Sequence, residues 1–173
     1  MKELDEHSYF DFLQADHSLS HFFQSGITTY LEMLNICQEN NIVKVYDVGC
    51  GYGWQSEIFL RGGVKYTGIE VAKHTYWKEN MTEDINYINK EYPFKIDSKS
   101  NEAVVSNMCI SWNCYLKDSD TLEKQVNAIS RDFNQAILYL SKDRTKYFIN
   151  EFKCCKVLQD DTFSKFVYLK KED

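Results

Sequence analysis

Val45-Tyr-Asp-Val-Gly-Cys-Gly-Tyr-Gly-Trp54 is the stretch of sequence that decides the fold. It contains the end of a β-branched run, a loop with glycine at alternate positions, and the start of a helix. The run at 42–48 is typical of a buried strand, and the glycines that follow let the backbone turn sharply and approach a ligand closely. Because open α/β sheets bind ligands beyond the carboxyl ends of their strands, this loop is predicted to lie at a ligand site.

Strands and helices alternate along the chain on both sides of this loop. An amphipathic helix is predicted at about 19–40, because apolar residues recur there at helical spacing, namely Phe23, Ile27, Tyr30, Leu31, Leu34 and Cys37. After the loop the pattern predicts a helix at 54–61 that ends at Gly62 and Gly63, a strand at 64–70, a helix at 72–80 and a strand at 85–88.

The C-terminal half continues the alternation and then closes with two strands. A strand is predicted at 102–109, followed by a helix that opens on the capping box Asp120-Thr-Leu-Glu123 and buries Leu122, Val126, Ile129 and Phe133. A strand at 135–141 and a short helix at 145–152 come next, and strands at 155–158 and 165–169 form a hairpin across a polar turn.

These elements predict one α/β domain over residues 1–173, with an N-terminal helical or lid segment at 1–40 and a core at 41–173. Its sheet is expected to be doubly wound, seven-stranded and mainly parallel, with helices on both faces and a C-terminal antiparallel hairpin. The aromatic start of the chain, Tyr9-Phe-Asp-Phe12, is either a lid over the site or a packing segment.

Composition narrows the class of protein. The net charge of −6 argues against a broad grip on nucleic acid, which depends on clustered lysine and arginine. The sequence lacks a signal-like start and any apolar run near the roughly 20 residues of a membrane helix, so we expect a soluble cytoplasmic protein without membrane contact. The six cysteines form no Cys-x-x-Cys pair and the histidines are scattered, so no metal site is expected.

Three readings of the glycine loop can be compared by spacing. A dinucleotide site uses Gly-x-Gly-x-x-Gly, and here the third glycine comes one residue early, before the bulky Trp54. No Lys-Ser or Lys-Thr follows, so the Walker pattern fails. The third reading is a tight strand-to-helix turn that binds no ligand. Against it stands Glu70, which follows Gly51 by nineteen residues and ends a predicted strand. In that position its carboxylate can accept hydrogen bonds from ribose hydroxyls.

From about Val43 to Leu169 the chain resembles the class I S-adenosylmethionine-dependent methyltransferases. The first motif of that family, an acid followed by Gly-x-Gly-x-Gly, matches Asp47, Gly49, Gly51 and Gly53, and its second, an acid ending the second strand, matches Glu70. The resemblance implies S-adenosylmethionine as cofactor, with the loop backbone against its methionine part and Glu70 on its ribose. The terminal hairpin is similar to that family as well.

The same resemblance suggests further cofactor contacts. Cys50 and Val71 adjoin the two motifs and are assigned to the site. The family's acid for the adenine amino group has no direct counterpart, and Asn89 or Glu91 is left for that contact. Asn107 resembles the residue that lines the methionine end, although its segment is not the Asn-Pro-Pro-aromatic motif of enzymes that methylate adenine or glutamine.

The acceptor side is expected beyond the fourth strand. Trp112, Asn113 and Tyr115 would lie at the ligand-binding edge of the sheet, and Tyr52 and His21 are further acceptor-pocket candidates, each with an ordinary packing or surface role as the alternative. Methyl transfer from a sulfonium requires near-attack geometry and no fixed catalytic residue, so the catalytic residue is unassigned. His21 and His74 are the bases available for a hydroxyl acceptor.

The sequence therefore predicts S-adenosylmethionine-dependent methyl transfer to a small molecule. A binding or interaction protein that keeps the fold without catalysis, as a homodimer or with a partner subunit, is the alternative, motivated by the missing adenine acid and the lack of an acceptor motif. A nicotinamide-dependent oxidoreductase is disfavoured by the glycine spacing.

Overall fold

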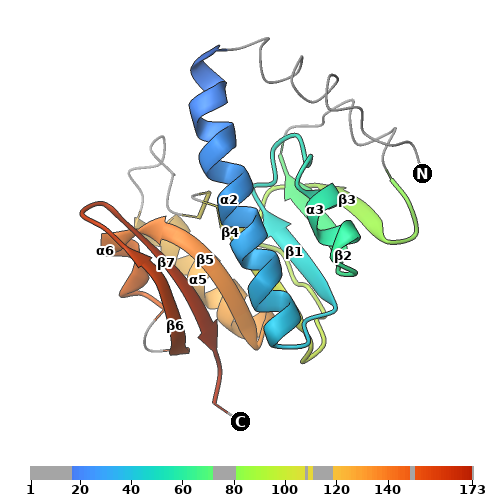
Figure 1. Ribbon diagram of the computed structural model, residues 1–173. Helices are drawn as coiled ribbons and strands as arrows, with labels where there is room; N and C mark the ends of the chain where they lie inside the picture. The colour runs from blue at the N-terminus through green and yellow to red at the C-terminus, as the bar shows by residue number, and fades with distance from the viewer. Residues whose placement is uncertain (1–16, 72–80, 108, 111–118, 149–150, 173) are drawn as a thin grey trace.

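The computed structural model describes residues 17–71, 81–107, 109–110, 119–148 and 151–172, with the backbone alone for 17–25, 119–121 and 154. Seven strands form one sheet in the order β3-β2-β1-β4-β5-β7-β6 (Figure 1). Their bounds are β1 Lys44–Val48, β2 Lys65–Glu70, β3 Ile85–Asn89, β4 Glu102–Asn107, β5 Gln135–Ser141, β6 Lys153–Asp160 and β7 Ser164–Lys170. The helices are α2 His17–Glu39, α3 Ser56–Arg61, α5 Ser119–Asp132 and α6 Lys142–Thr145.

The direction of the strands confirms the predicted fold class. β1 pairs in parallel with β2 and β4, β2 with β3, and β4 with β5. β7 runs antiparallel to both β5 and β6, so the one reversed strand lies next to the edge and the terminal hairpin completes the sheet.

Alternate residues of the strands fill two separate cores, because successive side chains of a strand point to opposite faces of the sheet. Val45 and Tyr66 belong to the core that also holds Met33 of α2 and Phe59 of α3. The other core holds Tyr46, Ile69, Leu138 and the α5 residues Leu122, Val126 and Ile129. Figure 1 shows α2 across one face of the sheet and α5 behind the other.

Two predictions about helices were wrong in detail. Leu31 of α2 is 47% exposed, whereas Met33 and Ile36 are buried, because Leu31 lies about 100° around the helix from the buried Tyr30. The helix expected at 145–152 is instead α6 at Lys142–Thr145, followed by turns from which Phe148 and Phe152 both reach the core. The four-residue spacing of the two phenylalanines is also the spacing of an amphipathic helix. Here it arises because both rings are buried from consecutive turns.

Other expectations fall outside the description. The predicted helix at 72–80 and the aromatic segment 9–12 lie outside the described residues. None of the described helices combines the length and apolarity that a membrane crossing requires.

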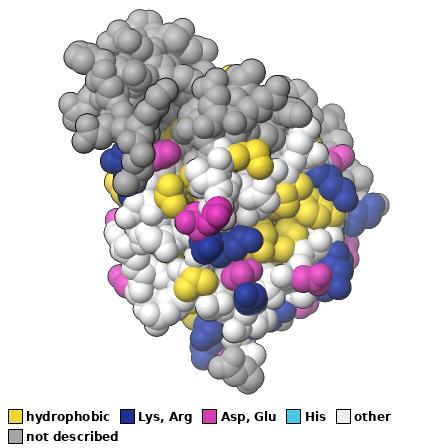
Figure 2. All heavy atoms as spheres, turned by 90° about the vertical axis from the view of Figure 1, so that its right-hand side faces the viewer, with side chains coloured by type: hydrophobic (Ala, Val, Ile, Leu, Met, Phe, Trp, Pro, Cys, Tyr) yellow, Lys and Arg dark blue, Asp and Glu magenta, His cyan; other side chains and the backbone are white. Residues whose placement is uncertain are grey.

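Seen from the side on which β3 lies, apolar side chains gather in a band among charged ones (Figure 2).

Candidate functional site

The order of the strands creates a divergence at the carboxyl end of β1. From β1 the chain passes to β2 and β3 on one side, and β4 then begins the other half of the sheet on the opposite side of β1. Asp47 of β1 lies in register with Gly68 of β2 and Val105 of β4. Connections that leave in opposite directions open a crevice at such a point, and ligands of doubly wound sheets bind there.

The glycine loop at this edge has the backbone that its sequence predicts. Gly49, Gly51 and Gly53 all have positive φ angles, of 78°, 54° and 78°. At Gly49 an added Cβ would lie 1.9 Å from the Cys109 Sγ, so only glycine fits between the loop and the residue that follows β4. At Gly51 an added Cβ would meet no described atom within 4 Å, so this glycine faces open space.

Glu70 is oriented by the loop and by its own neighbour. The Gly51 amide donates a hydrogen bond to its Oε2 at 3.2 Å, and the Val71 amide donates to its Oε1 at 2.7 Å. A carboxylate oxygen can accept more than one hydrogen bond, and Glu70 lines the cavity described below. The Asn89 side-chain amide donates to the carbonyl oxygens of Glu70 and Val71, which places Asn89 as a brace of this turn.

A buried carboxylate lies behind the loop. The Asp47 Oδ2 accepts hydrogen bonds from the Tyr66 hydroxyl at 2.7 Å and from the Gln55 side chain at 2.6 Å. The same Gln55 nitrogen lies 2.9 Å from the Cys50 carbonyl oxygen and 3.3 Å from the hydroxyl of Tyr30 in α2. This network connects the end of β1, the loop and the N-terminal helix.

Two buried oxygen atoms of this network lack hydrogen-bond partners, and burial disfavours the charge on Asp47. Among the described residues, the Asp47 Oδ1 and the Gln55 Oε1 have no hydrogen-bond partner although both atoms are buried. Burial raises the pKa of Asp47 to about 6, even though hydrogen bonds from Gln55 and Tyr66 act in the opposite direction. A buried acceptor without a donor costs free energy, so both oxygens are prepared to receive hydrogen bonds from a ligand or a water molecule.

Tyrosine and serine side chains hold the remainder of the loop. The hydroxyl of Tyr87 in β3 donates to the Gly53 carbonyl oxygen at 3.0 Å and lies 3.1 Å from the Ser56 Oγ. The Ser106 hydroxyl donates to the Val48 carbonyl oxygen at 3.0 Å and so ties the ends of β4 and β1 together. The neighbouring strands β3 and β4 therefore position the loop.

A cavity of about 210 Å³ opens beside the loop. Its walls come from the ends of β1, β2 and β4, the turn after β3, and α5, and consist of Val48, Gly49, Ile69, Glu70, Val71, Lys90, Glu91, Tyr92, Cys109 and Gln125. Whole small-molecule sites commonly measure roughly 300–1,000 Å³, so this cavity suits one part of a larger ligand that extends over the open loop.

The structure brings several of the predicted site residues to this edge. Gly49, Glu70 and Val71 line the cavity, and Asn89 contacts the Glu70 turn. Asp47 and the Cys50 side chain are buried behind it, whereas Tyr52 is 45% exposed. Asn107 ends β4 beside α2, where its side chain lies near Gly26.

Other predicted residues cannot be placed. Trp112, Asn113, Tyr115 and His74 lie outside the described residues, and His21 belongs to α2 with its side chain outside the description. Sequence reasoning missed Gln55, Tyr66, Tyr87 and Tyr30. A glutamine in the first turn after the glycines was the available signal for Gln55, while the three tyrosines read simply as core residues.

Comparison with solved structures found the same architecture. A TehB-like SAM-dependent methyltransferase from Corynebacterium glutamicum has a TM-score of 0.68 at 14% identity, covering 97% of this chain and 100% of that chain. The Burkholderia thailandensis 1,6-didemethyltoxoflavin-N1-methyltransferase, crystallised with S-adenosylhomocysteine, has a TM-score of 0.63 at 13% identity over 100% of this chain and 93% of that chain.

The Synechocystis magnesium protoporphyrin IX methyltransferase with bound SAM has a TM-score of 0.61 at 13% identity, covering 93% of this chain and 84% of that chain. A scan against protein-family models and a search of curated proteins found no match. Together with the strand order and the hairpin, these likenesses establish that the chain has the class I S-adenosylmethionine-dependent methyltransferase fold.

Proposed function

We propose that this protein binds S-adenosylmethionine at the glycine loop and transfers its methyl group to a small molecule. The observation that carries the proposal is the Glu70 carboxylate, held by the Gly51 amide at the wall of the cavity beside an open loop. The fold neighbours crystallised with SAM or S-adenosylhomocysteine support the choice of cofactor.

The residues present fit this cofactor by three features. Gly51 has open space where a side chain would stand, Glu70 presents its carboxylate at the cavity wall, and the buried Asp47 and Gln55 oxygens lack a partner among the described residues. When bound, S-adenosylmethionine supplies an electrophilic methyl group on a sulfonium. Its ribose hydroxyls are the kind of donor that the Glu70 carboxylate at the cavity wall requires, whereas Asp47 and Gln55 support the loop from behind.

Each residue has a distinct role in the proposed site. Glu70 would accept hydrogen bonds from the ribose hydroxyls, and Gly49, Cys50, Gly51 and Gly53 would contribute backbone contacts. Val71 and Asn89 would lie toward the adenine and Asn107 toward the methionine end. Asp47 is a positioning residue, because its contacts run through Gln55 to the Cys50 carbonyl oxygen.

The acceptor is proposed to be a small molecule because the net charge of −6 disfavours nucleic acid. Tyr52, Trp112, Asn113, Tyr115 and His21 remain the proposed acceptor-side residues. Their task would be to hold the acceptor in line with the methyl group and to exclude water, since such a displacement requires no fixed catalytic residue.

Calorimetric titration with S-adenosylmethionine, S-adenosylhomocysteine and NADH tests the cofactor. We expect micromolar binding of the two adenosyl ligands and none of NADH. Gly51→Val should abolish binding by filling the open space, and Glu70→Gln should weaken it about 10- to 150-fold, as loss of a charge-assisted hydrogen bond would. Glu32→Gln, an equal charge change on the exposed side of α2, is the control.

Unchanged affinity in Gly51→Val and Glu70→Gln would exclude this site. Transfer of labelled methyl to metabolite pools, compared with purified RNA and protein, tests the acceptor class. Cofactor binding without transfer to any of these acceptors would favour the non-catalytic alternative, and robust labelling of RNA or protein would overturn the small-molecule acceptor.

A further inference from the structure

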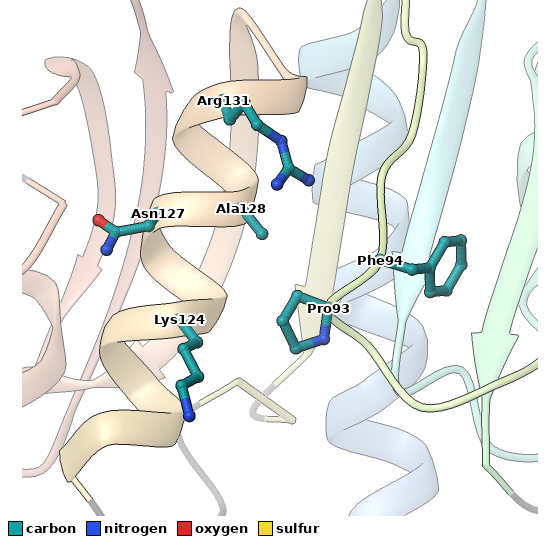
Figure 3. Close-up of a pocket in the computed structure, with 6 residues that line it drawn as sticks. All are labelled: Pro93, Phe94, Lys124, Asn127, Ala128 and Arg131. Atoms are coloured by element: carbon teal, nitrogen blue, oxygen red, sulfur yellow. The ribbon is translucent and has the colours of Figure 1, made fainter.

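A second cavity lies outside the proposed cofactor site, between α5 and the connection that follows β3. It measures about 350 Å³ and is lined by Pro93, Phe94, Lys124, Asn127, Ala128 and Arg131. In Figure 3, Lys124, Ala128 and Arg131 extend from the side of α5 that faces Pro93, whereas Asn127 and Phe94 point away from the gap.

The cavity is open because the connection between β3 and β4 is an extended segment and contains no helix. Parallel strands are normally joined through a helix, but residues 90–101 contain none. Tyr92 and Ile96 bury their side chains in the core, and the Ile96 amide donates to the Asp132 Oδ2 at 3.0 Å. An extended segment covers less of α5 than a helix would, so one side of α5 remains accessible.

The charge of this cavity is opposite to that of the chain. Lys124 and Arg131 are seven residues apart, which places them on one side of α5 about 10 Å apart along its axis. Among the residues that the structure describes, no acidic side chain lines the cavity, although the net charge of the chain is −6, and the Asp132 carboxylate beside it is paired with Arg131. Lys124 makes no ion pair with any residue that the structure describes.

Arg131 retains donors for a ligand as well. Its Nε and one terminal nitrogen bind the two oxygens of Asp132, at 2.6 and 2.7 Å. A guanidinium has five N–H donors in a planar fork, so this pair fixes the group and leaves three N–H groups unused by Asp132. Between the two cations, the Pro93 ring and the Ala128 methyl group form apolar walls.

We propose that this cavity is a second site, which binds a small organic anion with a phosphate or carboxylate group on a flat apolar body. The volume falls within the range of small-molecule sites, and the walls suit a planar group. Lys124 and the three N–H groups of Arg131 that Asp132 does not use select a negatively charged group. The site adjoins the end of the cofactor cavity that is formed by the turn after β3 and by α5.

The two cavities are lined by adjacent residues of the same two segments, so the second site is an effector site, a role that rests on the proposed function. Tyr92 and Gln125 line the cofactor cavity, and their immediate neighbours Pro93 and Lys124 line the second cavity. Tyr92 is buried and its hydroxyl has no hydrogen-bond partner among the described residues. An anion that orders the segment beside Pro93 would order the cofactor wall too, and such coupling is reciprocal.

Titration of the full chain with 1-naphthyl phosphate tests the site, with 1-naphthol and inorganic phosphate as separate ligands. S-adenosylhomocysteine is kept saturating, so that the cofactor cavity is filled. We expect 1-naphthyl phosphate to bind at least ten times more tightly than either control ligand. Lys124→Gln should weaken binding at least tenfold, whereas Lys156→Gln on β6 at the opposite edge of the sheet should not change it.

A second variant tests whether weaker binding of 1-naphthyl phosphate could result from loss of folding. Arg131→Lys keeps a cation beside Asp132 but removes the planar fork, so binding should weaken while the melting temperature remains near that of the unaltered protein. Equal affinity in Lys124→Gln, competition by S-adenosylhomocysteine, or equally tight binding of inorganic phosphate would each overturn the assigned site or its ligand class.

The effector role is measured as the affinity for S-adenosylhomocysteine with and without 1-naphthyl phosphate. We expect the anion to raise that affinity at least fivefold, and an unchanged affinity would overturn the coupling. Failure of the proposed function looks different, because S-adenosylhomocysteine would then not bind, whereas direct binding of 1-naphthyl phosphate and its loss in Lys124→Gln would be unaffected.

Discussion

Two connections at the ligand-binding half of the sheet are held by different forces. The glycine loop after β1 is fastened by polar bonds, from Glu70, Gln55 and Tyr87, and by the buried carboxylate of Asp47. The connection at 90–101 is fastened by hydrogen bonds at Ile96, Ser98 and Ser100, but its first part, beside the second cavity, is anchored by the burial of the Tyr92 ring. Directional bonds fix a backbone before its ligand arrives, whereas apolar anchors tolerate adjustment, so the first connection suits a cofactor and the second suits an adaptable effector site.

The largest effect should come from filling the close contact in the glycine loop. Gly49→Val would bring a branched side chain against Cys109 at a φ of 78°, so we expect a loss of about 4 kcal/mol or more in the free energy of unfolding. Gly51→Ala, at a φ of 54° with no described atom near the new methyl group, should cost about 1 kcal/mol. Urea unfolding measures the free energy of unfolding of both variants. Equal losses would contradict the difference in packing between Gly49 and Gly51.

The next effect is a pH dependence of stability that arises at the buried Asp47 behind the glycine loop. Asp47 has a pKa of about 6 in the folded protein against an ordinary value of 3.8, so the folded state binds more protons between these values. The free energy of unfolding should therefore fall by about 2 kcal/mol, relative to Asp47→Asn, as the pH rises from 4 to 7. Urea unfolding of both proteins across this range tests the sign, and parallel pH profiles would refute it.

A pair of matched hydroxyl deletions compares the two connections directly. Tyr66→Phe removes a donor to the buried Asp47, so we expect a loss of about 1.5–3 kcal/mol in the free energy of unfolding. The smallest effect belongs to Tyr92→Phe, which removes a buried hydroxyl without a partner among the described residues. It should be neutral or stabilise the fold by up to about 1 kcal/mol.

Thermal and urea unfolding of the two variants provides the measurement. A loss in Tyr92→Phe as large as that in Tyr66→Phe would mean that both connections depend on polar bonds. The contrast between them would then be wrong.

Much of the fold could be predicted because local patterns and tertiary packing agree. The β-branched runs that became β1 and β2, the alternating glycines and the polar turn of the hairpin all have a short-range cause. Predictions failed where burial overrode local spacing, as at Leu31 and at Phe148 and Phe152. Gly49 and Glu70 could be placed at one edge of the sheet for the same reason, since Gly49 directly follows β1 and Glu70 ends β2, and both strands have clear local patterns.

The sequence by itself determined the loop, the acid at the end of β2 and the class of fold, because glycine backbone freedom and strand periodicity are local properties. Only the tertiary structure brought Tyr66 and Gln55 onto Asp47, set Cys109 against Gly49, and left α5 uncovered beside Pro93. These contacts join residues distant along the chain, or depend on how much of a helix an extended segment covers. No local pattern encodes such distances, so the second cavity emerged only from the folded chain.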